Sequence, residues 1–503
     1  MQRYVGITIG PIFDTILDAP SPAALWFASS LFSDVSRRIC IQVRHEFSDA
    51  VIYSPYFGQE IETDDGIGKF HDRIIFSTGK YDRQVMQQLV LKVKQETAEC
   101  FPEKLITSQA VVFLEQYLQI HYIILEEKEL QNRNCILALS PYLDLLELMK
   151  SFPKDNKANV IRQLLCGEEE SGNIYIKKSP LFQRIREDFN QLKKDKNGLW
   201  TVEDISCCHG TIKENRKRKN YYAVVQADGD NMGKFLERLY NHEVTEFSKA
   251  CFDYDKEACE EIGKFGGMSI YAGGDDLLFL APIINTKGES VFALCVKIGE
   301  LFRKRIASVA FQQDKACIPT ISFGIAVQNK KYPLYEALAN ARKLLDLAKE
   351  GTLQKNNMAV EVLKHSGRSL RVLIPNQEHE VLQKVLELGA KEEKTVHSVI
   401  STLQKFETLI FILNEKARKK EIDAAAFEHA FMNLFDNAQQ EPAKEYLKVI
   451  CNIYWRYFVA GNTKICVPHG AQEKEDPSLQ TFLYLLKIKK FLLEKEDGEP
   501  CIS

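Results

Sequence analysis

Residues 269–281 read Ser-Ile-Tyr-Ala-Gly-Gly-Asp-Asp-Leu-Leu-Phe-Leu-Ala. Two short apolar runs flank Gly273, Gly274, Asp275 and Asp276. Apolar runs of this length suit two neighbouring buried strands, and glycines supply the positive φ and the close backbone approach that a tight turn needs. The stretch therefore predicts a hairpin whose turn presents two adjacent carboxylates.

Adjacent carboxylates at a strand tip repel each other, so they are tolerated mainly where a divalent cation or solvent takes up the charge. The hairpin is accordingly either a metal-binding turn or a solvated surface turn. The choice depends on which other residues the fold brings beside it.

The chain of 503 residues is too long for one ordinary core and predicts about three domains or a few more. Hydrophobic content of 45% and charged content of 27% are typical of a globular protein. The first residues read as a strand rather than a signal peptide, and no apolar run is long enough to span a bilayer. We expect a cytoplasmic protein with no membrane partner.

The net charge of −3 argues against a chain that alone neutralises a long nucleic-acid backbone. If nucleic acid is a partner, other subunits would carry most of it. The 13 cysteines are scattered and odd in number, which indicates reduced thiols rather than a disulfide framework. The nearest approach to a zinc cluster is Cys207, Cys208 and His209 with the distant Cys166, and without any Cys-x-x-Cys pair we do not expect structural zinc.

Residues 1–135 predict an α+β module. Its expected strands are 4–9, 38–43, 51–56, 73–77 and a run from Ala110 onward, and its expected helices are 12–17, 24–32 and 82–100. Residues 136–215 predict a helical region with helices 142–152, 159–166 and 179–192. The basic run 213–219 that ends this region is either a solvated linker or an RNA contact.

Residues 216–370 predict a second α+β module. A buried-type strand, 221–227, leads into Asp228, and the expected order from there is strand, helix, strand, strand, helix, strand, helix. This order is that of a ferredoxin-like sheet with additions. In that topology Asp228 and the hairpin lie on neighbouring strands, so three carboxylates converge. Residues 371–503 predict a helical bundle suited to docking.

Three carboxylates, from Asp228, Asp275 and Asp276, can hold two divalent ions that activate a 3′-hydroxyl and steady a departing pyrophosphate. The backbone carbonyl of Gly229 could add an oxygen, and Gly273 and Gly274 allow close approach. Other candidates each have an ordinary alternative: Lys234 and Lys349 are phosphate contacts or solvated lysines, Asp230 is a fourth ligand or, as we favour, a helix N-cap, and Ser322 touches a base or ribose or fills the sheet.

Six stretches carry a family resemblance. In the second module they are 222–234 (Tyr-Ala-Val-Val-Gln-Ala-Asp-Gly-Asp-Asn-Met-Gly-Lys), 271–278 (Tyr-Ala-Gly-Gly-Asp-Asp-Leu-Leu), 322–325 (Ser-Phe-Gly-Ile) and 341–349, and in the first they are 7–13 and 25–31. They resemble the second and first palm domains of the large subunit of type III CRISPR effector complexes, especially the III-B branch. The resemblance implies an α+β protein with two ferredoxin-like palm domains, a helical insertion between them and a C-terminal helical bundle. The resemblance covers most of residues 1–370, and the helical C-terminus matches in character only.

The resemblance implies a polymerase that, once its complex pairs with target RNA, joins ATP molecules into cyclic oligoadenylates as second messengers. Carried over by position, Asp228, Asp275 and Asp276 bind Mg²⁺ or Mn²⁺. The first palm, which has no acidic pair, would bind the second ATP. The implied partners are guide and target RNA, backbone subunits, and a small helical subunit on the C-terminal domain.

Two departures from the family pattern matter. The first palm begins at the first residues, so we expect no HD nuclease domain, and we interpret His71-Asp72 as a coincidental match to that dipeptide. The paired cysteines of the family's zinc module are also missing. Within the family the site could instead join AMP to S-adenosylmethionine. A diguanylate-type cyclase shares the single-palm geometry without the second palm, and the remaining alternative is a catalytically silent scaffold.

Overall fold

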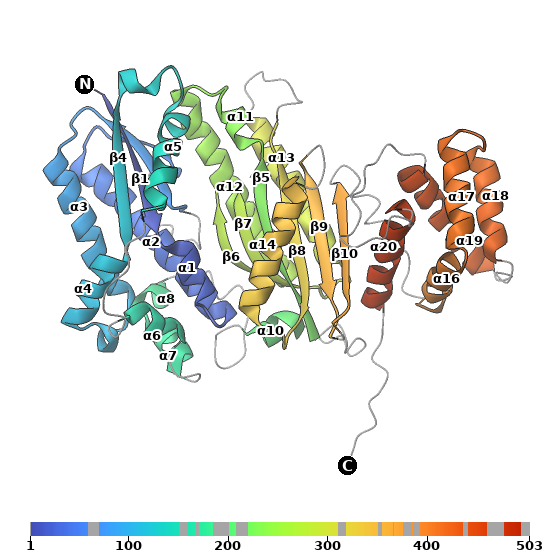
Figure 1. Cartoon of the computed structure of the whole chain (residues 1–503). Coiled ribbons are helices and arrows are strands. Elements are labelled where there is room, and N and C mark those ends of the chain that lie inside the picture. The colour runs from blue at the N-terminus through green and yellow to red at the C-terminus, as the bar shows by residue number, and fades with distance from the viewer. Residues whose placement is uncertain are drawn as a thin grey trace, which may run out of the picture.

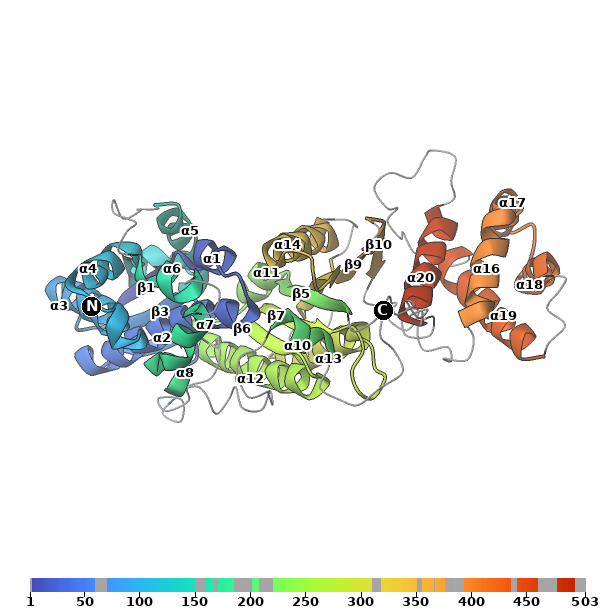
Figure 2. The same ribbon diagram turned by 90° about the horizontal axis from the view of Figure 1, so that it is seen from below.

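The computed structural model describes residues 2–58, 70–149, 159–166, 171–184, 201–207, 220–309, 318–350, 355–365, 367–375, 385, 393–435, 441–459 and 477–493. Two β-sheets lie side by side with helices around them, and a separate group of C-terminal helices follows at the far side of the second sheet (Figures 1 and 2). The basic run 213–219, Cys208 and His209 lie outside the described residues.

The first sheet is antiparallel and has the strand order β2-β3-β1-β4. Its strands are β1 (Arg3–Gly10), β2 (Val51–Ser54), β3 (Arg73–Thr78) and β4 (Gln119–Glu126). The helices of this module are α1 (Ile12–Leu17), α2 (Pro22–Glu46), α3 (Arg83–Glu96) and α4 (Ser108–Tyr117). The chain order βαββαβ with this strand order is the ferredoxin-like topology predicted for the first module.

The second sheet repeats that topology and extends it. The strand order is β10-β9-β8-β5-β7-β6, in which β8-β5-β7-β6 is the ferredoxin-like part. The strands are β5 (Tyr221–Asp230), β6 (Met268–Gly273), β7 (Asp276–Pro282), β8 (Thr320–Asn329), β9 (Asn357–Leu363) and β10 (Ser369–Pro375). The helices are α11 (Met232–Leu236), α12 (Asn241–Phe265), α13 (Val291–Ser308) and α14 (Leu334–Glu350).

Helices cover both faces of the second sheet, with α12 and α13 on one face and α14 on the other (Figure 2). Side chains alternate along β5: Ala223, Val225 and Ala227 pack into the core under α12 and α13, whereas Tyr222 and Val224 pack on the α14 side. By the same alternation Asp228 belongs to the α14 face. The strand pattern thus determines on which side of the sheet a functional carboxylate emerges.

The predicted helical region between the sheets contains α5 (Cys135–Glu147), α6 (Val160–Cys166), α7 (Ser171–Lys178), α8 (Pro180–Arg184) and α10 (Val202–Cys207). Helix α5 covers the face of the first sheet opposite α2 and α3, where a Cβ on Gly6 would lie 3.2 Å from Leu143. The C-terminal helices are α16 (Glu393–Lys405), α17 (Glu407–Arg418), α18 (Ala424–Met432), α19 (Glu441–Ile453), the π-helix Tyr454–Val459 and α20 (Pro477–Leu493). Helix α20 packs on the second sheet, where Phe491 meets the ring of Tyr221 edge-on at 4.8 Å.

Among the described residues no single helix has the length and apolar composition to cross a membrane. In the same part of the chain, α16 and α17 reach that length and hydropathy when taken together, but they are bent by 80° where they meet.

Two predicted strands were wrong, and one hairpin was missed. Residues 38–43 lie inside α2, where the buried side chains of Ile39, Cys40 and Val43 recur at helical spacing, so a short apolar run was misinterpreted as a strand. Residues 108–117 form α4, and the strand expected from Ala110 begins only at Gln119. The hairpin β9–β10 was not predicted, and the expected domain boundary at 370 falls inside β10.

One glycine sets how closely α14 approaches the second sheet. A Cβ on Gly324 of β8 would overlap the backbone of α14, because it would lie inside contact distance of the Ala341 carbonyl oxygen and 2.9 Å from the Leu345 Cα. Only glycine lets the helix and strand backbones come this close. Helix α14 is therefore held at a fixed distance above β5 and β8.

Gly324→Ala should lower the free energy of unfolding by about 1–3 kcal/mol, because the backbone of α14 must move to make room. Gly263→Ala is the matched control, since nothing lies within 4 Å of a Cβ added there in α12. It should leave stability unchanged or raise it by about 0.5–1 kcal/mol. Urea unfolding followed by circular dichroism measures both, and equal midpoints for the two variants would contradict this account of α14.

Candidate active site

The predicted hairpin is formed by β6 and β7. Gly273 pairs with Asp276, so Gly274 and Asp275 form a two-residue turn. Gly274 adopts φ +77°, in the left-handed region that favours glycine. Gly273 is enclosed: a Cβ there would lie 2.8 Å from the Tyr271 ring and 3.1 Å from the Cβ of His71 in the first module. The turn conformation thus favours glycine at Gly274, and close packing favours it at Gly273.

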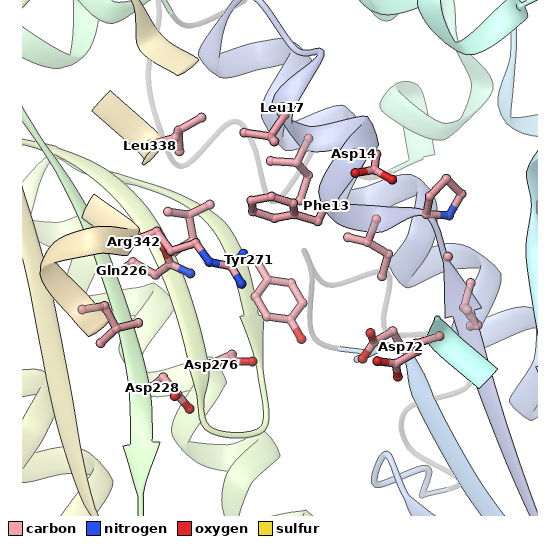
Figure 3. A pocket seen from close by; sticks show the side chains of 18 of the residues that line it. Phe13, Asp14, Leu17, Asp72, Gln226, Asp228, Tyr271, Asp276, Leu338 and Arg342 are labelled. Atoms are coloured by element: carbon pink, nitrogen blue, oxygen red, sulfur yellow. The ribbon is translucent and has the colours of Figure 1, made fainter. Parts of the chain in front are cut away.

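The predicted convergence of Asp228 with the hairpin is present. The last paired residues of β5 and β7 are Ala227 and Leu277, which places Asp228 across from Asp276 one residue farther along each strand. Both carboxylates line a cavity of about 590 Å³ between the two sheets. Figure 3 shows the two side chains on the same wall of that cavity.

Asp275 faces the other way. It packs against Gly229, where an added Cβ would lie 2.7 Å from both the Cβ and Oδ2 of Asp275, and it is not among the residues that line the cavity. Two of the three predicted carboxylates therefore share the cavity, while the third lies behind them on the α12 face.

Burial, and secondarily the nearby carboxylates, raise the pKa of both hairpin carboxyls. Removal from water and the nearby Asp230 raise the pKa of Asp275 to about 6. The pKa of Asp276 is raised well above its ordinary value by desolvation among the surrounding protein and by Asp275, Asp72 and Asp255, although its side chain still opens to the cavity. The pair thus favours binding a proton or a cation.

Lys349 contacts the carboxylate and carbonyl oxygens that are expected to bind a metal. From α14 its Nζ forms an ion pair with Asp228 and donates a hydrogen bond to the Gly229 carbonyl at 3.1 Å. Burial, with Lys355 nearby, lowers the pKa of Lys349 to about 8, so burial outweighs the neighbouring carboxylate. Lys234, by contrast, is exposed on the short helix α11 and does not line the cavity. Its position matches the alternative of a solvated surface lysine.

Asp230 and Ser322 form an internal pair. The Ser322 hydroxyl donates to Asp230 Oδ2 at 2.9 Å and accepts the Asn357 backbone N–H at 3.2 Å, and both side chains are fully buried. The favoured interpretation of Asp230 as an N-cap is wrong, because Asn231 takes that position in a left-handed conformation without a side-chain cap. Of the two roles expected for Ser322, these buried contacts favour filling the sheet over contacting a base or ribose.

The opposite wall of the cavity comes from the first module. The Gly10-Pro11 turn after β1 lines it together with Phe13 of α1 and Asp72, which precedes β3. Tyr271 reaches across from β6 between Asp276 and Asp72 (Figure 3). Burial and the nearby Glu147 raise the pKa of Asp72 to about 6, against the opposing effect of Arg73.

The cavity is strongly acidic. Among its described lining residues Arg342 is the one lysine or arginine, and its guanidinium stacks over the Phe13 ring at 4.4 Å. The lining carboxylates are Asp14, Asp72, Glu147, Asp228, Asp276 and Asp346. Sequence reasoning missed Asp72, Tyr271 and Arg342 as site residues. Two signals in the sequence could have indicated them. His71-Asp72 lies directly before a strand, and Arg342 lies about two helical turns before Lys349 on the same face of its helix.

The residues present supply part of a ligand set for a hard divalent cation. Asp228, Asp276 and the Gly229 carbonyl supply oxygen ligands of the kind that Mg²⁺ and Mn²⁺ prefer, and such ions normally complete their shell with water and substrate phosphates. In the described part of the chain no three His, Cys, Asp or Glu side chains are already arranged around one point as a metal cluster. Cys166, the distant cysteine considered for a zinc site, donates a hydrogen bond from its thiol to the Asp18 carbonyl at 3.2 Å.

Comparison with known proteins supports the resemblance seen in the sequence. Residues 221–359 match the family model described as Cas10/Cmr2, second palm domain. The CRISPR system Cmr subunit Cmr2 of Pyrococcus furiosus is 27% identical over 203 residues, which are 35% of this chain and 22% of that protein. The alignment thus spans about a fifth of the length of this curated relative.

Solved structures share the fold at low sequence identity. The apo Csm1–Csm4 cassette matches with a TM-score of 0.54 and 12% identity, covering 98% of this chain and 70% of the other. The apo type III-B Cmr-beta complex matches with a TM-score of 0.55 and 11% identity, covering 97% and 81%. The Csm1–Csm4 cassette in complex with cA4 matches with a TM-score of 0.52 and 13% identity, covering 98% and 70%. The predicted likeness to a type III palm-domain subunit is confirmed.

The raised pKa values predict a pH-dependent stability difference. A carboxyl whose pKa is raised in the folded state binds its proton at a higher pH there than in the unfolded state. Its ionised form therefore destabilises the fold at neutral pH, and this penalty disappears as pH falls. With chelator present, the Asp275→Asn/Asp276→Asn protein should be more stable than wild type at pH 7.5, by about 1 kcal/mol because water screens the exposed Asp276, with the difference shrinking towards pH 4.5.

Urea unfolding at several pH values measures this difference. Glu260→Gln, an exposed carboxylate of α12, is the control and should show no such trend. A double variant that is less stable than wild type at pH 7.5 would show that the carboxylates do not repel each other in the folded protein.

Proposed function

We propose that this chain is a metal-dependent nucleotidyltransferase that consumes ATP, releases pyrophosphate and makes a cyclic oligoadenylate second messenger in a type III CRISPR complex. The observation that carries the proposal is the pairing of Asp228 and Asp276 at one end of a cavity whose other wall is a second sheet of the same topology. A donor nucleotide and an acceptor can be held face to face in such a cavity.

Each side chain has a distinct role in this proposal. Asp228, Asp276 and the Gly229 carbonyl would hold Mg²⁺ or Mn²⁺, which when bound supplies activation of the attacking hydroxyl and neutralises charge on the departing pyrophosphate. Asp275 supports the pair from behind. Arg342, which lines the cavity, and Lys349, which would turn from its ion pair with Asp228, would contact phosphate oxygens near the carboxylates.

The partners follow from the same family likeness. Residues 1–135 would be the first palm and 136–215 an inter-palm region. The second palm would begin at 216, and the C-terminal helices would be a docking domain. Backbone subunits would bring guide and target RNA, and a small helical subunit would bind the C-terminal helices. Supporting this, α17 exposes the apolar side chains Leu409, Phe411 and Ile412.

A second candidate keeps the site and changes the acceptor. Six lining carboxylates make the cavity acidic even though Asp228 and Glu147 form ion pairs with Lys349 and Arg73, and this is unfavourable for a second triphosphate, which carries several negative charges of its own. S-adenosylmethionine carries a positive sulfonium and an ammonium group, and Asp72 on the first-module wall is suited to receive one of them. The acidic wall therefore favours joining AMP to S-adenosylmethionine as the alternative product.

The proposal predicts ATP turnover that depends on the hairpin carboxylates. The complex is assembled with guide and target RNA, given labelled ATP and Mg²⁺ or Mn²⁺ with and without S-adenosylmethionine, and its products are identified by mass. Asp275→Asn/Asp276→Asn should lower product formation by about 10³-fold or more, because the proposed metal ligand Asp276 and the carboxylate that supports it from behind are lost. The control Glu260→Gln should match wild type.

The outcomes separate the candidates. Undiminished synthesis by the double variant would sink the site assignment. Wild-type complex that makes nothing under any of these conditions would favour the catalytically silent scaffold. Product that forms only with S-adenosylmethionine would replace cyclic oligoadenylate with the alternative.

Asp72→Asn tests the acceptor wall. If the acceptor is cationic, the KM for S-adenosylmethionine should rise by about 10-fold or more, since a charged contact of about 1.5–3 kcal/mol is removed. The KM for ATP should change little, because Asp72 lies across the cavity from Asp228 and Asp276. A larger effect on ATP than on S-adenosylmethionine would contradict the assignment of this wall to the acceptor.

A further inference from the structure

We propose that Asp255, in the middle of α12, is a positioning residue that holds the turn of the metal-binding hairpin from behind. Its catalytic consequence rests on the function proposed above, whereas its effect on the turn does not. Asp255 lies outside every stretch that carries the family resemblance, and it does not line the cavity. It would act only through the backbone of the turn.

The contact that carries this inference is a hydrogen bond between a buried side chain and the turn. Asp255 is 1% exposed, and its Oδ2 accepts the backbone N–H of Gly274 at 2.9 Å. An ionised acceptor makes this bond shorter and stronger than a neutral one would. The N–H that is bound belongs to the first of the two turn residues, directly before Asp275 and Asp276.

The helix that carries Asp255 is itself held in place. Tyr254, the preceding residue, is fully buried and meets the ring of Phe302 in α13 edge-on at 5.0 Å. Helix α12 ends at Gly266, which adopts the left-handed conformation with φ +96°, just before β6 begins. The carboxylate is therefore presented to the turn from a rigid element.

The turn needs such support because its backbone direction sets where the carboxylates point. Gly274 has φ +77° and no side chain, so its own contacts restrain it little. Gly273 is confined by Tyr271 on one side and by His71 of the first module on another. The hydrogen bond to Asp255 fixes the remaining peptide group, and a rotation there would swing both Asp275 and Asp276.

The charge of Asp255 gives it a second effect on the same site. Its carboxylate lies directly at the turn that carries Asp275 and Asp276. Burying a carboxylate beside two others costs folding energy that a neutral residue of similar size would not. The same negative potential attracts a divalent cation to the turn, so the arrangement favours metal binding at the expense of stability.

Three variants test the proposal in the assembled complex. Asp255→Ala removes the acceptor, Asp255→Asn keeps an oxygen acceptor while removing the charge, and Asp253→Asn changes a partly exposed carboxylate two residues away on the same helix. Hydrogen exchange of the peptide that contains residues 271–276 reports on the turn directly. Mn²⁺ binding, kcat and the KM for ATP report on the site.

Asp255→Ala should speed exchange at the turn and should weaken Mn²⁺ binding or lower kcat by about 10- to 100-fold, as expected when a residue that orients a metal ligand is lost. The KM for ATP should stay within about two-fold, because the residue does not face the cavity. Asp255→Asn should restore slow exchange while recovering metal affinity only partly, since the amide oxygen replaces the acceptor but not the charge. Asp253→Asn should match wild type throughout.

Unchanged exchange and unchanged Mn²⁺ binding in Asp255→Ala would overturn the proposal. If that variant does not fold, Asp255→Ser makes the same comparison, because its hydroxyl is too short to reach Gly274. Faster exchange in a complex whose wild type turns over no ATP would keep the positioning role and reject the proposed function. Slower catalysis without any change in exchange would reject the positioning role alone.

Discussion

Repulsion between carboxylates is the constraint on which the candidate site depends. Asp228 and Asp276 stand on paired strands, Asp275 directly precedes Asp276 in the hairpin turn, and the pKa of both hairpin carboxyls is raised. A fold can hold such groups together only if other interactions fix the backbone beneath them. Here the restraints are the pairing of β5 with β7, the enclosed Gly273, the Asp255 hydrogen bond and the ion pair from Lys349.

The two sheets share a strand order but contribute different chemistry to the cavity. The second sheet provides the paired carboxylates, and helix α14 above it provides Arg342 and Lys349. The first sheet provides a backbone turn at Gly10-Pro11 and the half-buried Asp72. Close packing of α14 on Gly324 keeps the cationic side chains in reach of the carboxylates.

The sequence was sufficient to predict the hairpin, the convergence of Asp228 with it, and the ferredoxin-like order of the second sheet, because strand periodicity and glycine chemistry are local signals. For the first sheet that order came only from the family resemblance. The sequence was not sufficient for Asp72, Arg342 or Asp255, whose roles depend on packing between segments far apart in the chain. The same limit explains the error at Asp230 and the choice left open at Ser322, since only the pairing of β5 with β8 shows that they bind each other. The apolar run 38–43 failed because a few buried residues suit either period.

The division of the cavity between two modules has an evolutionary consequence. Residues proposed to hold the metal and residues proposed to face the acceptor lie in separate modules, so substitutions in one wall leave the backbone of the other in place. Under the proposed function, a lineage of such proteins can therefore change what it joins to a nucleotide without rebuilding the machinery that activates the nucleotide. Diversity of signalling products is easier to acquire on this architecture than diversity of chemistry.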